Sequence, residues 1–111
     1  MQRDETYLLD ILIAARRVEE YTREKAWDEF RRSNLLQDAV IRQFEIIGEA
    51  SRLVSQEFKD AHPEIPWRQM MGMRNRLIHE YFRVDVEIVW DASQNDIGTL
   101  ISAIEPFIPP Q

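Results

Sequence analysis

A short segment of the sequence holds a fixed cation, an amide, an imidazole and a phenol. Arg74 is followed directly by Asn75, and His79 and Tyr81 come five and seven residues after the arginine. An imidazole can take the proton from a ribose 2′-hydroxyl near neutral pH, and a guanidinium can stabilise the charge that builds on the attacked phosphate. His79 and Arg74 therefore supply the groups that metal-free RNA cleavage needs.

The spacing of these residues limits how one chain can arrange them. On an ideal helix, Arg74 and His79 are about 140° apart around the axis and roughly 7.5 Å apart along it, which an arginine side chain can span. His79 and Tyr81 are about 200° apart, so they share a cleft only if the helix ends there or a second subunit closes the site. An arginine and a histidine at this spacing occur often by chance, so the pair alone is a weak indication of function.

The distribution of charge points to the same segment. The chain has a net charge of −6, which disfavours non-specific attraction to a nucleic-acid backbone over most of the surface. Between Trp67 and Arg83, however, four arginines, including Arg76, stand against the single glutamate Glu80. This segment carries a charge of +3 and leaves −9 for the remainder. We expect an anionic ligand to bind here.

The residue content excludes several other kinds of site. The 111 residues include no cysteine, which excludes disulfide frameworks, thiolate zinc sites and cysteine nucleophiles. There is no HExxH motif, histidine pair or carboxylate-rich loop, so we expect neither a metal nor another cofactor. The chain begins without a signal-peptide pattern, and its most apolar run, Leu8–Ala15, is far shorter than the roughly 20 residues that cross a bilayer. We expect a cytoplasmic protein with no membrane partner.

Apolar residues recur at helical spacing along almost the whole chain, and capping residues and prolines divide the pattern into segments. The predicted helices are Asp4–Thr22, Ala26–Arg32, Leu35–Lys59, Pro66–Tyr81 and Val86–Ile104. No run alternates as a strand would. The expected architecture is all-α, an up-and-down bundle of four main helices and one short one, forming a single domain over residues 1–111.

A chain of this size buries a limited fraction of its surface. The long predicted helix carries a second apolar stripe, Ala39, Ile46 and Leu53, beside the stripe that a core would cover. Apolar surface left over after folding favours association with a second copy. We therefore expect a homodimer or a higher oligomer.

Some residues have more than one interpretation. Glu45 and Glu49, one turn apart on their helix, can pair with Arg42 or Arg52 on its surface, or they can face the cleft and orient Arg74. Gly72, inside a predicted helix, marks either a weak position or a place where another element approaches closely.

Two further types of residue are interpreted as structural. His62 precedes a proline at a helix end and is expected to be a solvated cap residue. Trp27, Trp67 and Trp90 lie beside apolar stripes and are expected in the core or in an interface.

Several stretches of the chain resemble the HepT-like branch of the HEPN superfamily. They are Tyr7–Leu12, Gln37–Arg42, Glu45–Ala50, Pro63–Arg68 and Gly72–Trp90. The signature of that family is an arginine, then four to six residues, then a histidine, one residue and a tyrosine, with a polar residue usually following the arginine. Arg74, Asn75, His79 and Tyr81 match this signature without a gap.

The resemblance implies an all-α HEPN fold and a metal-independent endoribonuclease toxin of a type VII toxin-antitoxin system. It implies a homodimer with a composite cleft, in which each copy contributes Arg74 and His79 and the substrate is RNA. Asn75, Arg76 and Glu49 are the expected supporting residues.

The resemblance also implies a partner, a nucleotidyltransferase antitoxin of the MntA type. This enzyme would neutralise the toxin by attaching AMP to Tyr81.

Two other functional classes remain. One is a non-catalytic HEPN module that binds a nucleotide or a nucleotidyltransferase partner. The other is a structural helical adaptor, which explains the bundle but leaves the positive segment without a role. A pure binding module has no chemical need for Arg74, His79 and Tyr81 together, so the ribonuclease is favoured.

Overall fold

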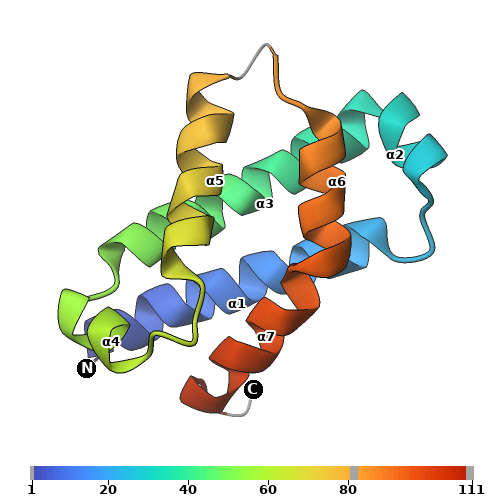
Figure 1. Ribbon diagram of the computed structural model, residues 1–111. Coiled ribbons are helices and arrows are strands. Elements are labelled where there is room, and N and C mark those ends of the chain that lie inside the picture. The colour runs from blue at the N-terminus through green and yellow to red at the C-terminus, as the bar shows by residue number, and fades with distance from the viewer. Residues whose placement is uncertain (1, 81–82, 110–111) are drawn as a thin grey trace.

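A computed structural model describes residues 2–80 and 83–109 of the chain (Figure 1). Its helices are α1 (Gln2–Thr22), α2 (Trp27–Arg32), α3 (Asn34–Leu53), α4 (Gln56–Ala61), α5 (Trp67–His79), α6 (Val86–Asn95) and α7 (Ile97–Ile104), followed by the 3-10 turn η1 (Glu105–Phe107). No strand occurs within these described residues. The predicted all-α helical bundle is confirmed.

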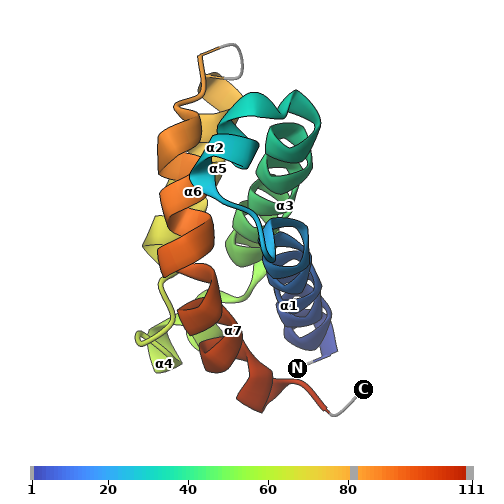
Figure 2. The same cartoon turned by 90° about the vertical axis from the view of Figure 1, so that its right-hand side faces the viewer.

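α3 is the central element of this bundle. It packs against α1 on one side and against α5 on the other, and it also contacts α2 and α6. Figure 2 shows α1 and α3 together on one side of the molecule and α5, α6 and α7 on the other. The core between them is formed by the predicted stripes of α1 and α3, with Ile11, Val18, Val40 and Ile47 almost completely buried.

The predicted helix Leu35–Lys59 is interrupted, because α3 ends at Leu53 and the separate helix α4 begins at Gln56. Ser55 caps α4, since its side chain accepts a hydrogen bond from the Phe58 amide. Asp4, which is 4% exposed, accepts hydrogen bonds from the Ser55 amide at 2.8 Å and from its hydroxyl at 2.7 Å. Asp4 therefore fixes the break between α3 and α4 instead of capping its own helix, which already begins at Gln2.

The predicted helix Val86–Ile104 is also divided. α6 ends at Asn95, and α7 begins at Ile97 after Asp96. The division has a packing reason, because α7 lies against α1 while α6 contacts α2 and α3. Each half buries its own apolar residues, including Val89 in α6 and Leu100 in α7.

The three tryptophans take up the predicted structural positions. Trp67 is buried and donates its indole N–H to the His62 carbonyl at 2.9 Å. Trp27 and Trp90 are half-buried and pack with Phe30, which is completely buried. The core interpretation of these residues is confirmed.

His62 caps the C-terminus of α4, as predicted. The expectation that it is solvated holds only in part, because its side chain is 28% exposed and its ring packs against two phenylalanines. The ring centroids of Phe58 and Phe107 are 4.4 and 4.5 Å away, and Nδ1 is 3.2 Å from the Glu64 carboxylate. His62 thus links α4 to the C-terminal turn.

None of the helices in the described ranges combines the length and the apolar character that crossing a membrane requires.

Candidate active site

Three of the four residues of the motif lie on α5. Arg74 and Asn75 are in its second half, and His79 is its last residue. Tyr81 lies outside the described residues. Arg76 and His79 are in the last turn, where positive charge is favoured by the helix dipole. The helix therefore ends directly beside the group that can act as a base.

The position of Arg74 depends on Gly48 in α3. A Cβ atom added at Gly48 would lie 2.1 Å from the Arg74 Cβ and 2.8 Å from the Met70 carbonyl oxygen. Neither of these atoms is the flexible end of a side chain, so any other residue at position 48 would force the two helices apart. The close approach that was considered for Gly72 occurs at Gly48 instead, because nothing in the described structure lies within 4 Å of a Cβ at Gly72.

The Arg74 guanidinium is held by two neighbours. Its Nη2 lies 3.5 Å from a Glu49 carboxylate oxygen, and its Nη1 donates a hydrogen bond to the Asn75 side-chain oxygen at 3.0 Å. Its Nε is buried and has no hydrogen-bond partner among the described residues. The side chain is 30% exposed. The guanidinium is therefore oriented at the surface while keeping donors that an anion can use.

Glu49 contacts both Arg52 and Arg74. Its carboxylate accepts hydrogen bonds from Arg52 Nε at 3.1 Å and Nη2 at 2.8 Å, and it also faces Arg74. Arg42 pairs with Glu45 instead. The hydrogen bond from Arg52, together with the charges of Arg52 and Arg74, lowers the pKa of Glu49 from its ordinary value. Glu49 is thus a carboxylate at the pH values at which the site would work.

The imidazole of His79 is exposed and forms no hydrogen bond with another described residue. The neighbouring Glu80 does not hold it, because the Glu80 carboxylate lies 3.4 Å from Arg76 Nε. Arg76 is therefore partly neutralised, whereas His79 is accessible to a substrate.

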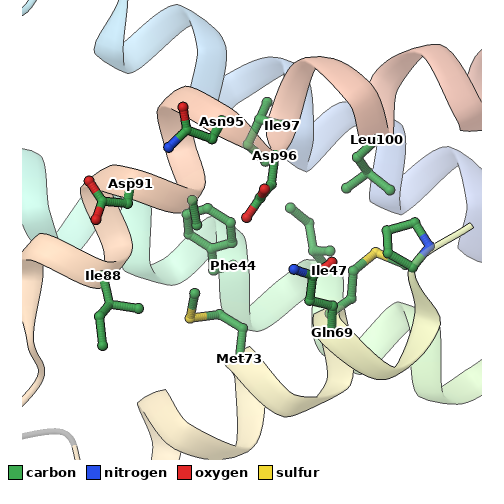
Figure 3. A pocket seen from close by; sticks show the side chains of 13 residues that line it. Phe44, Ile47, Gln69, Met73, Ile88, Asp91, Asn95, Asp96, Ile97 and Leu100 are labelled. Carbon is green, nitrogen blue, oxygen red and sulfur yellow. The ribbon is translucent and has the colours of Figure 1, made fainter.

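A separate cavity lies on another side of α5 (Figure 3). It has a volume of about 300 Å³ and is lined mainly by apolar side chains of α3, α5, α6 and α7, including Phe44, Met73 and Leu100. Neither Arg74 nor His79 lines it. No histidine lines the cavity, so the Arg74–His79 region is the better candidate for chemistry. Within the described ranges, no three acidic, histidine or cysteine residues are grouped so that they could hold a metal ion.

The family model described as "Ribonuclease HepT-like" matches residues 11–107. The chain belongs to the ribonuclease HepT-like family. The predicted resemblance is thereby confirmed, and this HepT-like ribonuclease is an RNA-cleaving nuclease.

Relatives in several organisms agree with this assignment. The chain is 48% identical over 99 residues to "Probable ribonuclease HepT" of Thermococcus cleftensis, and the aligned region covers 89% of this chain and 90% of that protein. It is 39% identical over 99 residues to a Methanocaldococcus jannaschii protein named as an RNase, with 89% and 91% of the two chains covered. A Caldanaerobacter subterraneus protein, also named as an RNase, is 32% identical over 108 residues, covering 97% and 96%. No solved structure matches this HepT-like ribonuclease.

Proposed function

We propose that this HepT-like ribonuclease is a metal-independent endoribonuclease that uses His79 and Arg74. His79 takes the proton from a ribose 2′-hydroxyl, whose oxygen then attacks the neighbouring phosphorus. Arg74 stabilises the charge that develops on the phosphate oxygens. The bond to the 5′-oxygen breaks, that oxygen takes up a proton, and the RNA is left with a 2′,3′-cyclic phosphate.

The orientation of the Arg74 guanidinium is the observation that carries this proposal. Glu49 and Asn75 hold it from two sides, and the exposed His79 lies on the same helix. A preorganised cation costs no reorganisation when charge develops, which is the main requirement for this kind of stabilisation. Arg76 adds positive charge beside the site, although Glu80 offsets part of it.

The first prediction concerns these two residues. Arg74→Ala and His79→Ala should each lower the rate of RNA cleavage by about two orders of magnitude or more, because each removes one positioned catalytic group. Cleavage of a defined RNA in excess chelator, followed on gels and by mass spectrometry of the product ends, measures this. His62→Gln changes the only other histidine of the chain and serves as the control, which should keep its activity.

Circular dichroism should show unchanged helix content in both alanine variants. Full activity in either of them, or a requirement for magnesium, would contradict the mechanism. RNA binding without any cleavage by the parent protein would favour the non-catalytic module.

We further propose that the active form is a homodimer with a composite cleft. One proton must be removed from the 2′-hydroxyl and one must be delivered to the leaving oxygen, so two copies of His79 can divide these tasks. Apolar side chains available for an interface are present, since Leu35, Leu53 and Ile78 are 83%, 39% and 38% exposed. Ile78 directly precedes His79.

The second prediction is the mass of the particle in solution. Light scattering at micromolar concentration should give twice the 13.3 kDa mass of the chain. The specific activity should fall on dilution below the dissociation constant, because a composite cleft needs both copies. A monomer with full activity would rule out the composite site.

Finally, we propose that the enzyme is the toxin of a type VII toxin-antitoxin system. Its partner would be an MntA-type nucleotidyltransferase that attaches AMP to Tyr81. Each AMP brings a phosphodiester charge close to Arg74 and Arg76, where it would occupy the place of the RNA phosphate and repel the substrate.

The third prediction tests Tyr81 as the acceptor. Co-expression with the nucleotidyltransferase should add AMP mass to Tyr81, detected by peptide mass spectrometry, and should abolish cleavage. Tyr81→Phe lacks the acceptor hydroxyl, so it should keep at least part of its activity and escape inactivation. If the partner silences Tyr81→Phe as completely as the parent protein, inhibition occurs by binding and not by modification.

A further inference from the structure

We propose that the outward face of α5 is a track for the RNA backbone, and that Arg68 binds a phosphate away from the one that is cleaved. The proposal rests on the proposed cleavage at His79. We call the residues Arg68, Gly72, Asn75 and His79 the α5 track.

The α5 track follows from the spacing of its residues. They are separated by steps of four, three and four along one continuous helix. On an ideal helix they lie within about 60° of one another around the axis, and the first and the last are roughly 16 Å apart along it. All four are exposed. A strand of RNA that reaches His79 and continues along this face would therefore meet Arg68 three turns earlier.

Arg68 has no structural task in the described part of the chain. It forms no ion pair or hydrogen bond with another described residue, and α5 contains no acidic residue. Arg68 is also in the first turn of α5, where a cation is disfavoured by the helix dipole. Its charge therefore does not stabilise the helix, and it is available for a ligand.

Gly72 leaves the middle of the track flat. A Cβ added there would meet no described atom within 4 Å, so no packing contact requires a glycine. Glycine inside a helix costs about 1 kcal/mol relative to alanine. The missing side chain lets a bulky chain lie close to the helix between Arg68 and Asn75.

The charge of the remaining surface favours RNA as the occupant of this face. The segment from Trp67 to Arg83 carries +3 within a chain of net charge −6, so a polyanion is attracted to this segment and repelled elsewhere. Binding of a phosphate by one arginine has a measurable signature, because it releases counterions and steepens the salt dependence of the affinity.

The test compares Arg68→Ala with Arg17→Ala, which removes an exposed arginine of α1 that also lacks an acidic partner among the described residues. Fluorescence anisotropy with an RNA carrying a 2′-O-methyl group at each nucleotide reports binding without cleavage. The slope of the logarithm of the RNA association constant against the logarithm of the salt concentration should become shallower by about 0.7 for Arg68→Ala. Arg17→Ala should leave the slope unchanged, and Arg68→Lys should restore it.

Steady-state kinetics with cleavable RNA provide the second readout. On a long RNA, Arg68→Ala should raise KM several-fold and leave kcat unchanged, whereas a dinucleotide substrate cannot reach position 68 and should show no difference. Gly72→Glu should raise KM on the long RNA more than Gly72→Gln does. Circular dichroism and light scattering verify that fold and mass are unchanged.

If the RNA affinity of Arg68→Ala depended on salt as steeply as that of the parent protein, the proposal would be overturned. The same conclusion would follow from a loss of kcat at constant KM, an equal loss on the dinucleotide, or dissociation of the oligomer, which would indicate that a second copy covers this face. These outcomes are separable from failure of the proposed function, since a protein that cleaves no RNA still reports its salt slope.

Discussion

The direct contact between α3 and α5 at Gly48 is the constraint on which the site depends. Without a side chain at this position, the Arg74 Cβ and the Met70 carbonyl lie against the α3 backbone. The next residue of α3, Glu49, then lies beside the Arg74 guanidinium. The position of the cation is thus set by the packing of two helices and not by a flexible loop, which is the kind of support that a preorganised catalytic group requires.

The charges around Arg74 are balanced so that it is held but not neutralised. Glu49 is hydrogen-bonded mainly to Arg52 and lies 3.5 Å from Arg74. Because the pKa of Glu49 is lowered in the folded state, its stabilising effect is present above its ordinary pKa of 4.5 and is lost as the pH falls through the lowered value. The orientation of Arg74 by this carboxylate is therefore maintained at neutral and mildly acidic pH.

Much of the architecture could be predicted from the sequence, because apolar periodicity reports which faces of α1 and α3 are buried. The breaks at Ser55 and Asp96 could not be predicted, since they depend on contacts with distant parts of the chain. Asp4, for example, is 51 positions away from Ser55, which it holds. Similarly, Arg74 and His79 were found through a local motif, whereas the role of Gly48 requires the position of a second helix. A glycine within the buried stripe of α3 was the one available signal.

The most direct test of this account is the cleavage activity of Gly48→Ala, with Gly98→Ala in α7 as the matched control. The methyl group at position 48 must displace α5 and with it Arg74, so kcat should fall by at least about tenfold, and stability in urea should fall by about 1–3 kcal/mol. Gly98→Ala adds its methyl group in open space and should be fully active and up to about 1 kcal/mol more stable. A folded Gly48→Ala protein with parental kcat would contradict the account.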